Sequence, residues 1–217
     1  MVDRKRVRTI IWDFNGTLLN DMQVCVDCMN IMLGERGLAK LDLERYRQIF
    51  TFPVREYYEK LGFDFNREPF EIPAHQFIDH YRVHLTEAPL HAGVIDLLDQ
   101  LKKRRIRHVI LSAMEQALLE DTLEKKGILD HFDKVVGIRD HLADGKLEMA
   151  RELVASLGED LSGLYLVGDT THDYEVAAGA NIPCLLIAHG HQSPERLRPL
   201  SCQVVNDLEE LMEKLLQ

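Results

Sequence analysis

Long apolar runs are absent from this sequence, and none approaches the roughly 18 residues that a membrane-spanning helix needs. Residues 1–8 are basic, but the apolar run that follows is short and lacks a small-residue cleavage site, so we expect no signal peptide. Cysteine is scarce: four in 217 residues are too few for a disulfide framework in a chain of this size. We therefore expect a cytoplasmic protein without a membrane segment.

Positive charge is also in short supply. The formal net charge of −10 argues against a nucleic-acid backbone or an anionic membrane as the main partner. The basic cluster at residues 102–108 falls at the end of a predicted helix, where cations complement the helix dipole. Cys25 and Cys28 form a C-x-x-C pair inside a helical pattern, far along the chain from Cys184 and Cys202. We expect packing cysteines and no zinc site.

Two kinds of pattern divide the chain. The apolar run Val7–Trp12 is bounded by turn residues and predicts a buried strand of a parallel sheet. Residues 20–88 show helical spacing with no convincing strand, whereas helices and strands alternate from residue 89 onward. We expect helices over 20–36, 43–50, 54–61, 74–85, 93–104, 115–126, 147–157, 174–180 and 208–216, and further strands over 108–111, 134–137, 164–167, 184–188 and 204–205. The pattern predicts an α/β fold: a Rossmann-like parallel-sheet core (1–19 and 89–217) with an inserted α-helical bundle as a cap (20–88).

Polar side chains stand at the ends of several predicted strands. Asp13 ends the first, Ser112 follows the second, Asp169 and Asp173 follow the fourth, and Lys146 precedes the helix that leads to it. The carboxyl ends of parallel strands share one edge of the sheet, so these residues should converge. Carboxylates, a lysine and a hydroxyl suit magnesium-assisted phosphoryl transfer, because oxygen ligands hold the metal while metal and lysine offset anionic charge. Each residue alone has an ordinary explanation, such as a helix cap; their ordered recurrence favours a site.

These residues form motifs that resemble a known family. Asp13-x-Asn15-Gly16-Thr17-Leu18, then Ser112, Lys146 and Gly168-Asp169-x-x-x-Asp173, resemble the four motifs of the haloacid dehalogenase superfamily. The resemblance is greatest to its phosphoglycolate-phosphatase-like branch, which carries a helical cap after the first motif. Residues 89–94, 127–133 and 179–183 also resemble connecting segments of that branch. Fold and motifs do not fix the substrate.

The resemblance implies roles for individual residues. Asp13 would be the nucleophile and would form an aspartyl-phosphate. Mg²⁺ would lie between Asp13, the main-chain carbonyl of Asn15 and Asp169, with Asp173 supporting the metal or Lys146.

Phosphate binding is implied for a second group of residues. Thr17, Ser112, Ala113 and Lys146 would bind the phosphoryl oxygens, and the helix at 115–126 would aim free amides at the same anion. In the cap, the aromatic segment 50–55 could set specificity, and Arg55 could hold a second anionic group of the substrate.

Asn15 departs from the family pattern, because phosphatases of this family carry an acid–base Asp there. An amide cannot titrate, and losing a positioned acid–base group costs about 10²–10⁴ in rate. Three explanations stay open: a substrate whose leaving group needs no proton, such as an acyl phosphate or pyrophosphate; a proton from the cap or the substrate, with His75, His80 and His84 as candidates; or an Asp-to-Asn trap. Asn15-Gly16 is also prone to deamidation, which would restore an Asp.

Other branches of the superfamily fit less well. Dehalogenases carry Tyr at position 15 and need no metal, and phosphonoacetaldehyde hydrolases use a cap lysine, for which Lys40 and Lys60 are available. His172 could tune the metal or touch the substrate, or be an ordinary loop residue, and His189 and His191 after the fifth predicted strand could line the entrance to the site. The leading hypothesis is a magnesium-dependent hydrolase of a small phosphorylated metabolite; the alternative is a phosphometabolite-binding or regulatory protein on a degenerate phosphatase scaffold. The sequence specifies no oligomeric state.

Overall fold

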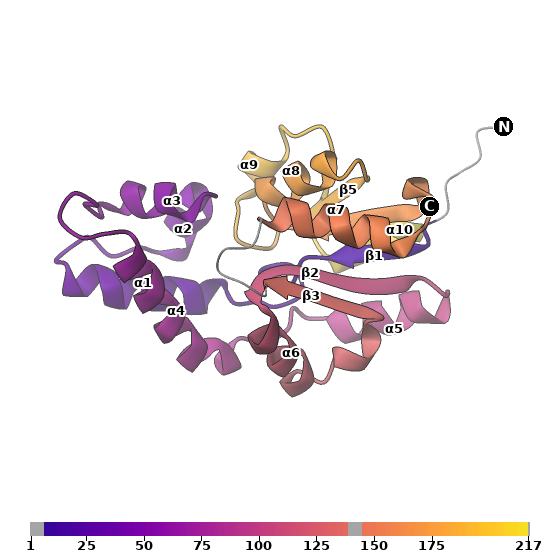
Figure 1. Cartoon of the computed structure of the whole chain (residues 1–217), viewed down its shortest axis with the longest axis horizontal. Coiled ribbons are helices and arrows are strands. Elements are labelled where there is room, and N and C mark those ends of the chain that lie inside the picture. Colours follow the sequence, from indigo (N-terminus) through magenta and orange to yellow (C-terminus); the bar gives the residue numbers. More distant parts are fainter. Residues whose placement is uncertain (1–6, 139–144, 217) are drawn as a thin grey trace.

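The core of the molecule is a parallel sheet. A computed structural model describes residues 7–138 and 145–216, and in this part of the chain six strands pair in the order β3-β2-β1-β4-β5-β6 (Figure 1). The strands are β1 (Thr9–Trp12), β2 (Arg107–Glu115), β3 (Lys134–Ile138), β4 (Leu164–Gly168), β5 (Cys184–Ile187) and β6 (Gln203–Val205). Every pairing is parallel. The α/β fold class predicted from the sequence is confirmed.

Strand β1 lies between β2 and β4, and all four of its residues are buried. Successive side chains of a strand point to opposite faces, so a strand covered on both faces is apolar throughout. Ile10 and Trp12 join one hydrophobic cluster, and Ile11 joins the other. The carboxyl end of β1 is therefore held at the middle of the sheet, where Asp13 N continues the ladder to Val167 O at 2.8 Å.

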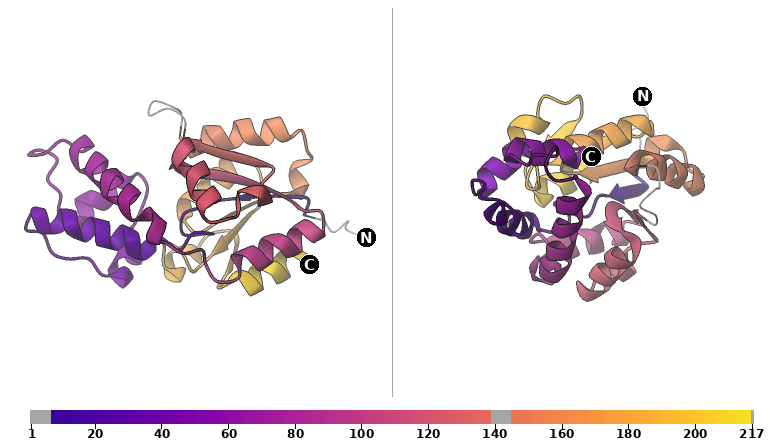
Figure 2. Two further views of the ribbon diagram at one scale, coloured as in Figure 1. Left: turned by 90° about the horizontal axis from the view of Figure 1, so that it is seen from below. Right: turned by 60° about the vertical axis from the view of Figure 1, so that its left-hand side comes forward.

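Helices cover both faces of the sheet, as Figure 2 shows. On one face lie α7 (Lys146–Leu157) and α8 (Thr171–Gly179), which bury Leu153 and Val176. On the other face lie α5 (Val94–Lys103), α6 (Gln116–Lys125) and α10 (Leu208–Leu216). Short helical turns complete the core: η2 (Leu129–His131), η3 (Leu161–Gly163) and α9 (Pro194–Leu197). This face-by-face burial leaves the carboxyl edge of the sheet for polar residues.

A group of helices lies beyond one end of the core (Figure 1). It comprises α1 (Met22–Glu35), α2 (Leu43–Ile49), α3 (Val54–Leu61), α4 (Glu71–His84) and the turn η1 (Leu85–Glu87). Tyr46, Tyr57 and Tyr58 are buried within it, and α1 contacts both α2 and α4. Cys25 and Cys28 are buried in α1 as free thiols, which agrees with their expected packing role.

Some elements differ from the sequence prediction at their ends. Strand β2 was expected to stop at residue 111, but it continues to Glu115 with a register irregularity after Leu111. Ser112 therefore lies within the strand, at the kind of irregularity that re-aims side chains near sites. Helix α8 begins at Thr171 rather than residue 174, because Thr170 and Asp173 form a capping box. Lys146 is the first residue of α7 instead of preceding it.

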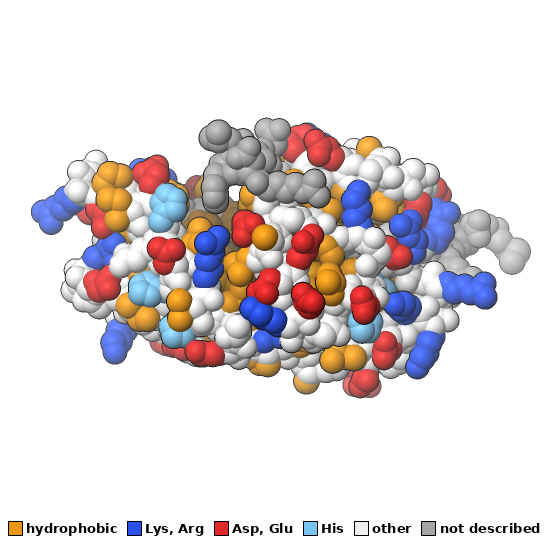
Figure 3. Space-filling view, turned by 60° about the horizontal axis from the view of Figure 1, so that its bottom comes forward, with side chains coloured by type: hydrophobic (Ala, Val, Ile, Leu, Met, Phe, Trp, Pro, Cys, Tyr) orange, Lys and Arg blue, Asp and Glu red, His pale blue; other side chains and the backbone are white. Residues whose placement is uncertain are grey.

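The surface carries both signs of charge. Acidic and basic side chains are interspersed over the face in Figure 3. No helix within the described ranges is long and apolar enough to cross a membrane.

Candidate active site

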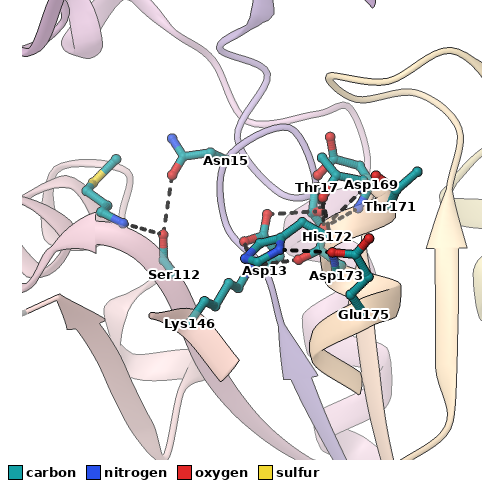
Figure 4. A network of polar contacts seen from close by, with 12 residues as sticks. Asp13, Asn15, Thr17, Ser112, Lys146, Asp169, Thr171, His172, Asp173 and Glu175 are labelled. Carbon is teal, nitrogen blue, oxygen red and sulfur yellow. Dashed lines mark hydrogen bonds and ion pairs between the residues drawn. The ribbon is translucent and has the colours of Figure 1, made fainter. Parts of the chain in front are cut away.

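A buried lysine joins two carboxylates at the carboxyl edge of the sheet (Figure 4). Lys146 Nζ donates to Asp13 Oδ1 and, at 2.7 Å, to Asp173 Oδ1. The three side chains come from the end of β1, the start of α7 and the first turn of α8, and all are buried. The convergence predicted for Asp13, Lys146 and Asp173 is thus present in the structure.

Asp169 lies beside this group at the end of β4. Thr17 Oγ1 donates to Asp169 Oδ1 at 2.8 Å, and the main-chain N–H of His191 donates to Oδ2 at 2.6 Å. Gly190 allows this close approach, because a Cβ there would lie 2.1 Å from Asp169 Oδ2. Gly16, with φ +77°, is required on the opposite side for the same reason. Both oxygens of Asp169 are therefore fixed.

The two carboxylate oxygens of Asp173 have different partners. Its Oδ2 accepts from Thr170 N at 3.0 Å, Thr170 Oγ1 at 2.7 Å and Asp169 N at 3.2 Å. These bonds complete the capping box and satisfy amides at the start of α8. Oδ1 is left for Lys146, so Asp173 holds the lysine in place against Asp13.

The charges at the site do not balance. Burial raises the pKa of Asp13 to about 8, with Lys146 opposing and the neighbouring Asp173 and Asp169 adding to the rise. Burial also raises the pKa of Asp169 to about 6 against the attraction of His191. For Asp173, the attraction and hydrogen bond of Lys146 overcome burial and the pKa is lowered. One ammonium group thus serves three carboxylates.

A metal ion fits this imbalance. One carboxylate oxygen from each of Asp13, Asp169 and Asp173 lies within 4.8 Å of the others. Buried carboxylate oxygens are the donors that Mg²⁺ takes, and a divalent cation would supply the missing positive charge. The residues present are therefore suited to a hard divalent cation.

Asn15 belongs to a second network behind the carboxylate cluster. Its Nδ2 donates to Asp21 Oδ2 at 2.9 Å and to the Tyr81 hydroxyl at 2.8 Å. Tyr81 in turn donates to Asp21 Oδ2 at 2.5 Å. On the other side of the amide, Ser112 Oγ donates to Asn15 Oδ1 at 3.3 Å, as Figure 4 shows. Tyr81 comes from α4, so this network joins the helical group to the loop after β1.

Asp21 is also paired with a histidine. His191 Nε2 lies 3.3 Å from Asp21 Oδ1, and His191 Nδ1 lies 2.7 Å from the hydroxyl of Tyr46 in α2. Burial would lower the pKa of His191, but Asp21 and then Asp169 raise it to about 9. Burial would raise the pKa of Asp21, but His191, Tyr81 and Asn15 lower it. The result is a buried charge pair that connects both α2 and α4 to the core.

Two more histidines fix the loop after β1. The rings of His91 and His189 stack with centroids 3.7 Å apart. His91 Nε2 donates to Gly16 O and His189 Nε2 donates to Thr17 O, each at 3.0 Å. His189 therefore orders the loop that carries Asp13 and Asn15, which is more than the entrance lining considered from the sequence.

The structure does not bring every predicted residue to the site. Arg55 lies over the ring of Phe65 at 4.8 Å and pairs with Glu59 at 3.2 Å, on the surface of the helical group. The side chain of Ala113, which follows Ser112 in β2, is exposed, so only the main chain of Ala113 is left for the predicted phosphate contact. The start of α6 was expected to offer free amides, but the Glu115 carboxylate accepts from Ala117 N and Leu118 N. That expectation was wrong for these two amides.

The aromatic segment before Arg55 does reach the core. The ring of Phe52 stacks on His172 with centroids 4.8 Å apart. Phe50 O accepts from Gln192 Nε2 at 3.1 Å and from Arg196. The segment 50–52 therefore lies against the first turn of α8 and the residues that follow β5.

Sequence reasoning missed Asp21 and Tyr81. Asp21 stands directly before α1, where an N-cap is expected, yet its side chain does not cap the helix and instead accepts from Gly16 N. Its position just after the first motif was the one feature of the sequence that could have marked Asp21 as a site residue. Tyr81 lies in an amphipathic helix, and nothing in the sequence distinguishes it from a packing tyrosine.

The parallel sheet with a buried carboxylate–lysine cluster at its carboxyl edge defines a hydrolase-type α/β site. The chain belongs to the haloacid dehalogenase-like hydrolase family, whose model matches residues 10–187. It is an enzyme of that family.

Individual relatives agree with this assignment. The phosphoglycolate phosphatase of Chromobacterium violaceum is 24% identical over 217 residues, and the match covers 96% of this chain and 97% of the relative. That of Rhodospirillum rubrum is 28% identical over 211 residues, covering 92% and 87%. A haloacid dehalogenase-like family hydrolase from Streptococcus pneumoniae has the same fold, with a TM-score of 0.84, 18% identity and coverage of 96% and 98%.

Proposed function

We propose that this chain is a magnesium-dependent phosphatase that acts on a small phosphorylated metabolite through an aspartyl-phosphate on Asp13. The observation that carries the proposal is the buried contact of Asp13 with Lys146 beside Asp169 and Asp173. Family membership supports hydrolysis, and the relatives from Chromobacterium violaceum and Rhodospirillum rubrum are both named phosphoglycolate phosphatase. We expect neither nucleic acid nor a membrane as a partner. The cytoplasmic location stays a prediction from the sequence.

Each residue of the cluster has a proposed role. Asp13, Asp169 and the main-chain carbonyl of Asn15 would hold Mg²⁺, which when bound would supply positive charge against the phosphoryl oxygens. Lys146 adds a second positive charge at Asp13, and Asp173 keeps the lysine there. Thr17, Ser112 and Ala113 would bind phosphoryl oxygens through hydroxyl or main-chain groups. Arg55 is not included, because its guanidinium packs on the helical group.

The helical group over residues 20–88 would act as a cap on the core formed by 1–19 and 89–217. Contacts of Tyr46 and Tyr81 with the buried His191–Asp21 pair support this division, because they join side chains of the helical group to the network that contains Asn15. A cap that closes over the site would exclude water and select the substrate.

Asn15 favours the alternative function, a phosphometabolite-binding or regulatory protein with negligible turnover. The intact set of Asp13, Lys146, Asp169 and Asp173 favours the enzyme, because loss of catalysis would relax the need for all of them.

One experiment separates the two functions. Phosphate release would be measured with and without Mg²⁺ across small phosphate esters and anhydrides, for wild type, Asp13→Asn and the control Asp121→Asn. Asp121 is a matched control, because its side chain is half exposed and pairs only across one helical turn with Lys125. We expect Mg²⁺-dependent turnover in wild type and the control, and none in Asp13→Asn. Tight binding of phosphorylated compounds without turnover of any would establish the binding protein instead.

A further inference from the structure

The side-chain amide of Asn15 is held in one orientation. Both hydrogens on Nδ2 are used, one toward Asp21 Oδ2 at 2.9 Å and one toward the Tyr81 hydroxyl at 2.8 Å. Tyr81 gives its own hydrogen to Asp21, so its oxygen acts toward Asn15 as an acceptor. Turning the amide over would place Oδ1 against two acceptors. Oδ1 therefore faces Ser112 and the active site.

The partner that sets this orientation is itself fixed. Asp21 is 1% exposed, and its Oδ1 accepts from Gly16 N at 2.9 Å and faces His191 Nε2 at 3.3 Å. A buried carboxylate with these donors cannot turn away to accommodate another acceptor. Position 15 thus presents one hydrogen-bond acceptor to the site and no proton.

This geometry favours one of the explanations for Asn15. An Asp at position 15 would place a second carboxylate in contact with Asp21, so the surroundings complement an amide and not a replaced acid. Two of the histidines of α4 that were proton-donor candidates have local partners: His75 bonds to Glu71 O in its own helix, and His84 pairs with Glu87 in the following turn η1. Of the explanations for Asn15, a leaving group that needs no proton is the one that these contacts favour.

We propose, resting on the proposed function, that the substrates are phosphoric anhydrides, acyl phosphates above all, and not alkyl phosphate esters. A carboxylate or phosphate leaves as a stable anion, because its conjugate acid has a pKa of about 4 or about 6. An alkoxide is a far stronger base and needs a proton as the bond breaks. A positioned general acid that supplies this proton raises the rate by about 10²–10⁴. The acceptor-only face of Asn15 penalises the ester and leaves the anhydride unaffected.

The two chemical steps balance without an acid at position 15. A carboxylate oxygen of Asp13 bonds to phosphorus, and the bond from phosphorus to the leaving oxygen breaks with its electron pair going to the leaving carboxylate. One acyl phosphate is thereby exchanged for another. Water then bonds to phosphorus, the Asp13–phosphorus bond breaks with its electron pair returning to Asp13, and a water proton passes to the phosphate product. Asn15 Oδ1 accepts a hydrogen bond from that water and orients it.

A leaving-group series tests the proposal on the unaltered enzyme. Values of kcat/KM would be measured with Mg²⁺ for acetyl phosphate, pyrophosphate, aryl phosphates of graded leaving-group acidity, and alkyl esters including phosphoglycolate. We expect rates to fall steeply as the leaving group becomes more basic, with acetyl phosphate at least about 10²-fold above the alkyl esters. Acetyl phosphate without pyrophosphate turnover would restrict the class to acyl phosphates.

An exchange of the two side chains provides the matched variant. Asn15→Asp combined with Asp21→Asn keeps one acid and one amide in contact but moves the acid to the active-site side. We expect this double variant to lower the ratio of acetyl phosphate to alkyl ester kcat/KM by at least about tenfold. Asp21→Asn alone is the control, because it loses the same carboxylate without adding an acid at position 15, and its ratio should not fall.

The outcomes are distinguishable. Alkyl esters cleaved as fast as acetyl phosphate by the wild type would overturn the anhydride proposal and leave the phosphatase intact. The anhydride proposal would also be overturned if the ratio of acetyl phosphate to alkyl ester kcat/KM fell equally in the double variant and in Asp21→Asn. Turnover of neither class would overturn the proposed function itself. If the double variant does not fold, the wild-type leaving-group series still supports or overturns the anhydride proposal by itself.

Discussion

Lys146 donates a hydrogen bond to Asp13, a residue 133 positions earlier in the chain, and both side chains are buried. The lysine also bonds to Asp173 at 2.7 Å. Burial would lower the pKa of Lys146, but Asp13 and Asp173 raise it, so the ammonium form is secured. In the proposed function, this cation would make a buried carboxylate usable as a nucleophile toward an anionic phosphoryl group.

Replacing Lys146 should therefore destabilise the protein as well as inactivate it. In Lys146→Met two buried carboxylates lose their shared cation, which should cost about 3–5 kcal/mol in the free energy of unfolding without metal. Mg²⁺ should restore part of that loss, because it supplies charge to the same carboxylates. Urea unfolding with and without Mg²⁺ measures both effects.

The control for this variant is Lys125→Met, which removes an ion pair whose lysine is 57% exposed. Exposed pairs contribute little, so its stability should change by less than about 1 kcal/mol. Equal stability of Lys146→Met and Lys125→Met would contradict the electrostatic description of the site.

Gly190→Ala should weaken the proposed metal site. The added Cβ would fall 2.1 Å from Asp169 Oδ2, which displaces that carboxylate or the loop that follows β5. We expect Mg²⁺ affinity, measured by titration calorimetry, to fall by about 10- to 100-fold. The control is Gly34→Ala in α1, where an added Cβ would meet nothing within 4 Å. This substitution should raise helix stability slightly, because alanine favours the helix over glycine. Unchanged Mg²⁺ affinity in Gly190→Ala would show that Asp169 is not a ligand.

His108 should contribute a loss of stability in mild acid, opposite in sign to the contribution of the Asp13 and Asp169 carboxyls, whose pKa values are raised. This side chain is 1% exposed and accepts a hydrogen bond from Trp12 Nε1 at 3.0 Å. Burial lowers its pKa to about 4, against a favourable attraction to Asp133. In the unfolded chain the pKa is about 6.5, so the unfolded state binds the proton first and stability is lost as pH falls from about 6.5 toward 4.

The size of the His108 effect follows from the same shift. By pH 5 the His108 contribution should reach about 2 kcal/mol relative to pH 7.5, measured as the difference between wild type and His108→Asn in the pH dependence of the unfolding free energy. His108→Asn keeps an acceptor for Trp12 but does not titrate, so its stability should depend less on pH over this range by that amount. An identical pH dependence in wild type and variant would rule out His108 as the cause.

Asn15 should resist deamidation in the folded protein. Deamidation requires Gly16 N to attack the Asn15 side chain, but this nitrogen is held by Leu19 O at 2.8 Å and Asp21 Oδ1 at 2.9 Å. We expect deamidation at Asn15, followed by peptide mass spectrometry, to be at least about tenfold slower in native protein than in urea. Equal rates would mean that the loop opens freely.

Much of the fold follows from local patterns in the sequence. The helices over 54–61 and 208–216 begin and end where their apolar spacing and the bounding Pro53, Gly62 and Asp207 indicate. Strand β2 was missed beyond residue 111, because three of the four residues that extend it (Ser112, Ala113 and Glu115) are polar or small and the pairing of the extension depends on neighbouring β3. The start of α8 was missed because its capping box uses a site carboxylate, Asp173.

The candidate site also contains residues that the sequence predicts and residues that it does not. Asp13 and Asp169 end apolar runs, so their meeting at one sheet edge was predictable from parallel pairing alone. The network of Asp21, Tyr81 and His191 was not, because its members lie 60 and more residues apart and meet only through packing of the cap on the core. The orientation of Asn15 depends on that network, so the sequence left its chemistry open.

The nucleophile is the central claim, and trapping the phosphoryl group tests it directly. Wild type mixed with acetyl phosphate and Mg²⁺ would be quenched in acid within one turnover, digested, and analysed by mass spectrometry. We predict one phosphoryl group on the peptide that contains Asp13, absent from Asp13→Asn and discharged when the sample is left to turn over. Turnover with no phosphoryl group on that peptide, or with activity retained in Asp13→Asn, would contradict a covalent role for Asp13.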